Sequence, residues 1–195
     1  MIRTFIALDL PPDVRESLEK FARELKKADA PVAWVKPDRI HLTLKFLGDV
    51  PEERIPDIRE AMERVAASTA PLTLRASGCG AFPTMKELRI VWVGLCGGRE
   101  SLAGLARRIE EALVPLGFKR EGRPFKPHLT LGRVKGRQRL RALQDALLAN
   151  RDFAAEDFDV AEVVLYKSDL RPEGARYTPL YRAALAGHPE VSIEV

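Results

Sequence analysis

The tetrapeptide His-Leu-Thr-Leu occurs twice in the sequence, at positions 41–44 and 128–131. Two further segments recur in the same order, Arg-Glu-Ser-Leu at 15–18 and 99–102 and Ala-Arg at 22–23 and 106–107. One three-residue insertion reconciles the offsets of 84 and 87 positions, so the matches indicate an internal duplication with approximate repeats 2–82 and 88–170. A duplication with only two copies favours a single closed, two-lobed domain over residues 1–195 rather than an open solenoid.

The spacing of apolar residues predicts alternating strands and helices in both halves. We expect strands at 2–10, 34–35, 40–47, 72–75, 88–95, 128–134, 160–166 and 177–185. We expect Pro11-Pro12 to end the first strand and a helix to follow to about Lys27. We expect further helices from near Pro56, along the Leu102–Leu113 stripe and over Leu140–Leu147. Gly48-Asp49 should end the first histidine strand. Pro179 lacks an amide hydrogen, so its strand should lie at a sheet edge.

The repeated tetrapeptide predicts a distinctive chemistry. Successive side chains of a strand point to opposite faces, so His41 shares a face with Thr43, and His128 shares one with Thr130. The leucines of both copies then point to the other face, toward a core. If a pseudo-two-fold axis relates the halves, both His/Thr faces can meet across one cleft.

Two such histidines suit the hydrolysis of a phosphodiester. One imidazole can take a proton from attacking water and the other can protonate the departing oxygen, near neutral pH and without a metal. The threonine hydroxyls can donate hydrogen bonds to phosphoryl oxygens, and the cation of Arg133 can stabilise the phosphate charge. Strict alternation puts Arg133 on the face opposite His128, so a strand end or a bulge after Gly132 must turn it into the cleft.

Other interpretations of these residues remain open at this stage. A single His-Leu-Thr-Leu strand is ordinary, and its histidine is more often structural than catalytic. Phe46 and Phe125 could each stack on a nucleobase, although core packing is the more usual fate of an aromatic side chain. The basic loop from Lys119 to Pro127 could contact an RNA backbone or could simply be solvated. We interpret His188 as a solvated tail residue.

Composition restricts the classes of function. The formal net charge of +4 and the pI near 9.2 weakly favour an anionic partner such as RNA. No signal peptide or apolar run of about 20 residues is visible, so we expect a cytoplasmic protein without a membrane segment. No Walker loop, Gly-x-Ser-x-Gly elbow or His-Glu-x-x-His pair occurs. Two cysteines and three scattered histidines make poor zinc ligands.

These motifs resemble the 2H phosphoesterases, and within them the bacterial and archaeal RNA 2′,3′-cyclic phosphodiesterases, historically called 2′-5′ RNA ligases. Segments along nearly the whole chain carry the resemblance: Arg3–Ala7, Trp34–Pro37, Ile40–Gly48, Phe82-Pro83, Leu88–Gly94, Arg123–Arg133, Leu165–Leu170, Gly174 and Tyr177. The resemblance implies an α+β fold of two pseudo-symmetric lobes, each an antiparallel sheet with outer helices, around a central cleft.

The resemblance also implies an activity and a set of roles. The expected reaction is metal-independent hydrolysis of RNA 2′,3′-cyclic phosphate ends to 2′-phosphomonoesters, with weak ATP-independent 2′-5′ RNA ligation as a second activity. By position, His41 would be the general acid and His128 the general base, while Thr43, Thr130 and Arg133 would hold the phosphate. The residues alone do not distinguish acid from base. A non-catalytic RNA-end binding module, or a phosphoesterase for another small cyclic phosphate such as ADP-ribose 1″,2″-cyclic phosphate, remains an alternative. We expect a monomer.

Overall fold

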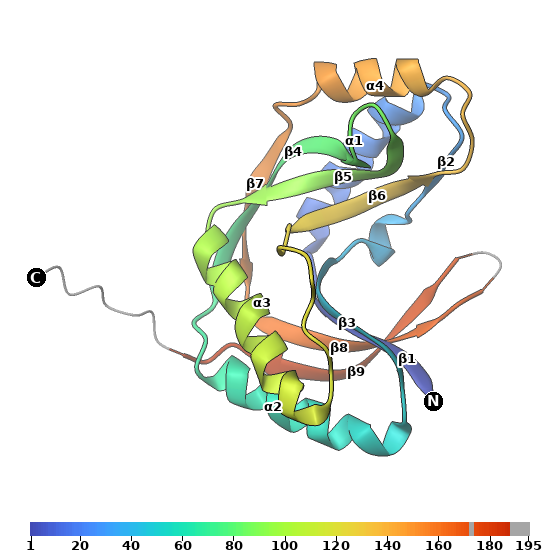
Figure 1. Cartoon of the computed structure of the whole chain (residues 1–195). Helices are drawn as coiled ribbons and strands as arrows, with labels where there is room; N and C mark the ends of the chain where they lie inside the picture. The colour runs from blue at the N-terminus through green and yellow to red at the C-terminus, as the bar shows by residue number, and fades with distance from the viewer. Residues whose placement is uncertain (172–173, 188–195) are drawn as a thin grey trace, which may run out of the picture.

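Two antiparallel sheets form the frame of the computed structural model, which describes residues 1–171 and 174–187 (Figure 1). Within these residues the first sheet has the order β3-β1-β8-β9, with bounds Leu42–Val50, Ile2–Leu8, Glu162–Asp169 and Arg176–Ala184. The second sheet, in the same described part of the chain, has the order β2-β6-β5-β4-β7. Its bounds are Val32–Trp34, His128–Val134, Leu88–Cys96, Leu72–Pro83 and Ala154–Val160. The expected α+β architecture is therefore confirmed.

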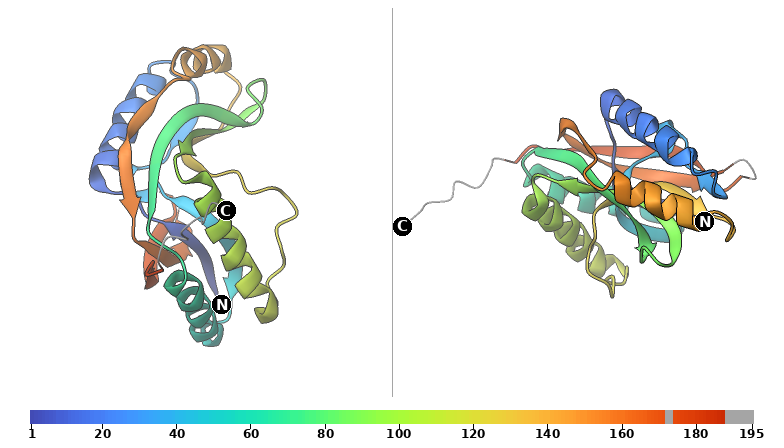
Figure 2. Two further views of the ribbon diagram at one scale, coloured as in Figure 1. Left: turned by 90° about the vertical axis from the view of Figure 1, so that its left-hand side faces the viewer. Right: turned by 90° about the horizontal axis from the view of Figure 1, so that it is seen from above.

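Helices cover the outer faces of both sheets. They are α1 (Pro12–Lys26), α2 (Ile55–Ala67), α3 (Arg99–Leu113) and α4 (Leu140–Ala149), with short 3₁₀ turns at Pro37–Arg39, Glu52–Arg54 and Val114–Leu116. Proline stands in the first turn of both α1 and α2, where its missing N–H costs no helical hydrogen bond. α1 and α4 lie on the sheet that contains β5 and β6, while α2 and α3 lie on the other (Figures 1 and 2).

The two halves of the chain interlock. β4 belongs to the first half of the sequence but pairs with β5, and β8 belongs to the second half but pairs with β1. The helices cross in the same way, because α1 packs against β7 and α3 packs beside β3. Each sheet therefore contains strands from both halves, and neither half forms a sheet by itself.

The leucines of the repeated tetrapeptide lie in the hydrophobic core. Leu42, Leu44, Leu129 and Leu131 are all less than 8% exposed, with values of 1%, 7%, 0% and 1%. Burial of a leucine side chain contributes roughly 1.5–3 kcal/mol. The core thus fixes one face of each histidine strand. The opposite faces, which carry the histidines and threonines, are free to face each other.

Several strand predictions need correction. β3 does not end at Gly48, because this residue adopts a φ of +76° and the strand continues to Val50. The strand expected at 160–166 is β8, which begins at Glu162, and β7 (Ala154–Val160) was not predicted. β7 is an edge strand whose segment Ala-Ala-Glu-Asp-Phe-Asp-Val contains three acidic residues and only one β-branched residue, so it lacks the usual strand signal. Pro179 does lie in an edge strand, β9, as predicted.

None of the helices formed by residues 1–171 and 174–187 has the length and apolar character needed to cross a membrane. His188 lies outside the described residues, so its interpretation as a tail residue stays a prediction.

Candidate active site

A cavity of about 310 Å³ contains all six predicted site residues. The side chains that line it come from both sheets: Arg3, Phe5, Val35, Arg39, His41, Thr43, Phe46, His128, Thr130, Arg133, Ser168, Leu170, Ala175 and Tyr177. The structure therefore brings the two His/Thr faces together in one enclosure, although 87 positions separate them in the sequence.

Both histidine strands contain a bulge directly after the threonine. In β3, Thr43 is opposite Ala7 and Lys45 is opposite Ile6, so Leu44 is the extra residue. In β6, Thr130 is opposite Trp92 whereas Gly132 is opposite Val91, so the extra residue is the leucine at the equivalent position, 131. A bulge shifts the alternation of side chains by one residue. The residues after it therefore change face.

This shift returns Phe46 and Arg133 to the cleft. Arg133 lines the cavity together with His128, and the bulge that puts it there precedes Gly132 rather than following it. Phe46 occupies the equivalent position in β3 and is 43% exposed, so the expectation that it packs in the core is wrong. Phe125, in contrast, is partly buried against the core.

The two imidazoles are oriented in the same way. Nδ1 of His41 lies 2.9 Å from the backbone oxygen of Arg39, and Nδ1 of His128 lies 2.7 Å from that of Lys126. A carbonyl oxygen only accepts hydrogen bonds, so Nδ1 carries a hydrogen in both rings. Nε2 is then the nitrogen of each ring that can exchange a proton with a ligand in the cavity.

Aromatic rings enclose His41. Its ring stacks on Phe5 at a centroid distance of 4.7 Å and meets the edge of Tyr177 at 5.0 Å. Burial lowers the pKa of His41 below its usual value of 6.5, against the opposing effects of the Arg39 carbonyl and the negative charge of Asp9. In the absence of a ligand the neutral imidazole is thus favoured.

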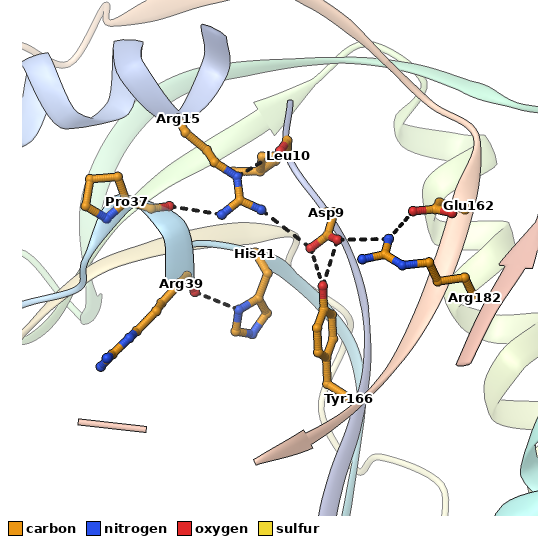
Figure 3. Close-up of polar contacts among 9 residues, drawn as sticks. All are labelled: Asp9, Leu10, Arg15, Pro37, Arg39, His41, Glu162, Tyr166 and Arg182. Carbon is orange, nitrogen blue, oxygen red and sulfur yellow. Dashed lines mark hydrogen bonds and ion pairs between the residues drawn. The ribbon is translucent and has the colours of Figure 1, made fainter. Parts of the chain in front are cut away.

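A network of charged groups lies behind His41 (Figure 3). The hydroxyl of Tyr166 donates to both oxygens of Asp9, at 2.6 and 2.7 Å. Arg15 and Arg182 approach the same carboxylate at 3.5 and 3.3 Å. Burial and Asp9 raise the pKa of Tyr166, so the phenol remains protonated and acts as a fixed donor. The network therefore places one compensated carboxylate near His41.

His128 has different neighbours. The edge of its ring meets Phe82 at a centroid distance of 4.9 Å, and Phe82 in turn lies 5.2 Å from the ring of Trp92. Position 80 requires glycine, because a Cβ on residue 80 would lie 2.6 Å from the indole ring of Trp92. Residue 94, directly opposite His128 on β5, is also a glycine, so the adjacent strand places no side chain opposite this imidazole.

Three arginines supply positive charge to the cavity. The guanidinium of Arg3 lies over the ring of Phe46, 4.5 Å from its centroid. Arg39 and Arg133 both lower the pKa of Tyr177 against the larger, raising effect of burial, which places their charges near this phenol. A cavity of this polarity suits an anion such as a phosphate ester.

Sequence reasoning did not select Arg3, Arg39 or Tyr177 as site residues. Arg3 follows from the alternation of β1, because it lies two positions before Phe5 and both residues line the cavity. No local signal identifies Tyr177, because its position depends on the pairing of β9 with β8 at the far side of the sheet.

The architecture and the paired histidine strands are those of the 2H phosphoesterase class that the sequence resembles. The chain belongs to the 2′-5′ RNA ligase superfamily, whose family model matches residues 5–172. A relative from Archaeoglobus fulgidus is 35% identical over 182 residues, which are 92% of this chain and 98% of the relative. A relative from Methanothermobacter thermautotrophicus is 34% identical over 179 residues, 92% of this chain and 96% of the relative. Both are named RNA 2′,3′-cyclic phosphodiesterase.

Solved structures with the same fold agree with this assignment. TT0787 of Thermus thermophilus superimposes with a TM-score of 0.80 at 30% identity, over 96% of this chain and 100% of that one. E. coli LigT complexed with 3′-AMP has a TM-score of 0.73 at 28% identity, over 94% of this chain and 98% of that one.

Proposed function

We propose that this protein hydrolyses the 2′,3′-cyclic phosphate ends of RNA to 2′-phosphomonoesters, with His41 as general acid and His128 as general base. The observation that carries the proposal is that both imidazoles line one arginine-rich cavity and use Nδ1 for a backbone contact, which leaves Nε2 for the substrate. The names of the relatives support the substrate class.

The proton transfers balance with these two groups. Nε2 of neutral His128 takes a proton from water, whose oxygen forms a bond to phosphorus. The bond between phosphorus and O3′ breaks, and Nε2–H of protonated His41 gives its proton to O3′. The products are a 2′-phosphate and a 3′-hydroxyl. One proton then leaves His128 and another returns to His41, both through solvent.

The lowered pKa of His41 is compatible with the role of acid. A phosphodiester anion that enters the cavity favours the imidazolium, because opposite charges attract strongly where water is scarce. Once protonated, an imidazole with a low intrinsic pKa releases its proton readily to the departing oxygen. Substrate binding thus charges the acid that the reaction needs.

The remaining cavity residues would bind the substrate. Thr43 and Thr130 can donate hydrogen bonds to the phosphoryl oxygens, and Arg133 can stabilise the charge that develops on them. Phe46 is exposed at the cavity wall and would contact the nucleoside.

Because the two imidazoles account for both proton transfers, we propose that the reaction requires no metal or cofactor. Turnover should stay within about twofold of its normal rate in excess chelator, given that loss of a catalytic metal removes several kcal/mol of stabilisation. Loss of activity with chelator and its recovery with a divalent cation would refute this part of the proposal.

The same groups can also direct the phosphoryl group to an alcohol instead of water. A 5′-hydroxyl in place of water would join two RNA ends through a 2′-5′ linkage without ATP, because no nucleotide activation is needed to reopen a cyclic phosphate. We propose that this ligation is weak and that the protein acts as a monomer in the cytoplasm.

Turnover of a nucleoside 2′,3′-cyclic phosphate by the purified protein tests the proposal. An enzyme converts the compound, whereas a binding module retains it unchanged. ADP-ribose 1″,2″-cyclic phosphate serves as the competing substrate. A higher kcat/KM for that compound would replace RNA ends as the substrate class and leave the acid–base chemistry in place.

A further inference from the structure

A second hollow, of about 980 Å³, opens beside the catalytic cavity. It shares three lining residues with that cavity, Thr43, Phe46 and His128, so the two spaces adjoin at these residues. Residues of β3, β4, β5 and α3 form its walls, together with residues of the segment 121–126. Figure 1 shows the course of this segment between α3 and β6. We name this hollow the lateral groove.

Unpaired basic side chains converge on the lateral groove from three separate elements. Arg89 comes from β5, Arg107 from α3, and Arg123 and Lys126 from the connecting segment. All four are exposed. Within residues 1–171 and 174–187, none of their side chains makes a hydrogen bond or an ion pair. These charges are therefore available to a ligand.

The acidic side chains of the groove do not cancel this charge, because a buried lysine faces them. Nζ of Lys45, 4% exposed, lies 2.7 Å from a carboxylate oxygen of Glu110 and 3.6 Å from one of Glu121. Burial tends to raise the pKa of Glu110, but the hydrogen bonds from Lys45 and from the amide of Glu121 lower it overall. Glu110 thus stays ionised and engaged with its own lysine.

The same lysine holds the outer wall of the groove in place. Nζ of Lys45 donates to the backbone oxygen of Lys119 at 2.7 Å, and the amide of Glu121 donates to Glu110 at 2.6 Å. The segment before His128 is therefore attached to β3 and α3 at its beginning. Arg123 and Lys126 lie on a preformed wall, which lowers the entropic cost of binding a ligand there.

We propose that the lateral groove binds the single-stranded RNA that precedes the cyclic phosphate, which makes the protein selective for oligonucleotide over mononucleotide ends. This inference rests on the proposed function. Proteins that bind single strands combine cations along the backbone with aromatic surfaces for the bases, and here Phe82 and Phe125 line the groove beside the four cations. Because the groove adjoins the catalytic cavity at His128, a single RNA strand can occupy the groove and the cavity together.

The double variant Arg107→Ala/Arg123→Ala tests the proposal, because its two residues lie on different elements of the groove and outside the catalytic cavity. We expect kcat/KM for an RNA oligonucleotide with a 2′,3′-cyclic end to fall about tenfold at low salt, while that for a cyclic mononucleotide stays within about twofold. Arg120→Ala is the matched control, because Arg120 is an exposed arginine directly before this segment and does not line the groove.

A binding measurement separates this inference from the proposed function. The Kd of a fluorescent, 2′-phosphorylated RNA oligonucleotide requires no turnover. Loss of two phosphate contacts should reduce the slope of log Kd against log salt by about 1.4. Unchanged binding, or an equal loss in Arg120→Ala, would overturn the groove assignment whether or not the protein hydrolyses cyclic phosphates. Equal losses for oligonucleotide and mononucleotide substrates would overturn it as well.

Discussion

The two histidine strands share one backbone design but stand in different surroundings. His41 directly precedes β3 and His128 begins β6, and each imidazole bonds to a carbonyl two residues earlier. In both strands the bulge follows the threonine by one position. Beyond the bulge the strands diverge. β3 carries the buried Lys45 and then Phe46, whereas β6 carries Gly132 and then Arg133.

This difference fits the proposed acid and base roles. We propose that the shared backbone geometry presents both Nε2 atoms to one ligand, while the unlike neighbours suit the two rings to different proton transfers. Aromatic rings and the charge of Asp9 surround His41, which suits a proton donor that is charged by its anionic substrate. His128 is opposite a glycine on the adjacent strand, and the edge of its ring meets Phe82. We propose that an ancestral duplication supplied the common part and that later substitutions made the two strands unequal.

Removal of either imidazole should have the largest effect. We expect His41→Ala and His128→Ala each to reduce kcat by roughly 10²–10⁴-fold, because each general acid or base contributes about that factor. The double variant should lose much less than the product of the two factors, since the groups act as a unit. Steady-state kinetics measures these losses, and circular dichroism checks that the variants fold. Near-normal kcat in either single variant would refute the acid–base pair.

Substitutions of Arg133 and Phe46, which occupy equivalent positions after the two bulges, should affect the kinetics differently. We expect Arg133→Met to lower kcat by roughly 10²-fold, because it removes a cation aimed at the developing phosphoryl charge. Phe46→Leu should change kcat little and raise KM, since it alters only contact with the nucleoside. Steady-state kinetics gives kcat and KM separately for each of the two variants, and these values are compared. A larger loss of kcat in Phe46→Leu than in Arg133→Met would reverse the assigned roles.

Lys45 should matter for stability. Lys45→Met leaves Glu110 without its main partner, so we expect the free energy of unfolding to fall by about 2 kcal/mol. This is below the roughly 3–5 kcal/mol typical of a broken buried pair, because the Glu110 side chain is 22% exposed. Urea denaturation measures the change. Lys45→Met/Glu110→Gln should recover part of it, and Glu60→Gln, in an exposed pair, serves as the control. An unchanged free energy of unfolding in Lys45→Met would contradict the proposed role of Lys45 as an anchor.

The pKa of His41 should report on its environment. In the free protein its imidazole should titrate below 6.5, because burial disfavours the charged ring. Asp9→Asn should lower this pKa further, since Asp9 favours the imidazolium. Binding of a 2′-nucleotide should raise it. NMR titration of the ring protons measures all three. A pKa above 6.5 in the free protein would contradict the enclosed site.

The sequence was sufficient to predict the features that repeat. The two His-x-Thr strands, their buried leucines and most helices follow from periodicity and from the matched tetrapeptides. It was not sufficient for features that depend on pairing between distant strands. The bulge at Leu44 has no signature in its own residues, so the exposure of Phe46 could not be foreseen. The acidic edge strand β7 and the position of Tyr177 depend likewise on neighbours far along the chain.

The interlocking of the halves illustrates the same limit. Matched segments indicate a duplication, but they do not say which sheet receives the last strand of each copy. That choice depends on how β4 and β8 pair across the molecule. It is also what ties the two histidine strands to a single core.

The identity of the product formed from an RNA oligonucleotide with a defined 2′,3′-cyclic phosphate end tests the central claim most directly. Phosphorus NMR distinguishes the two possible monoesters. If His41 protonates O3′ while His128 activates water, the product carries a 2′-phosphate and a free 3′-hydroxyl. A 3′-phosphate, or a cyclic end that remains intact after long incubation with the wild-type protein, would contradict the account.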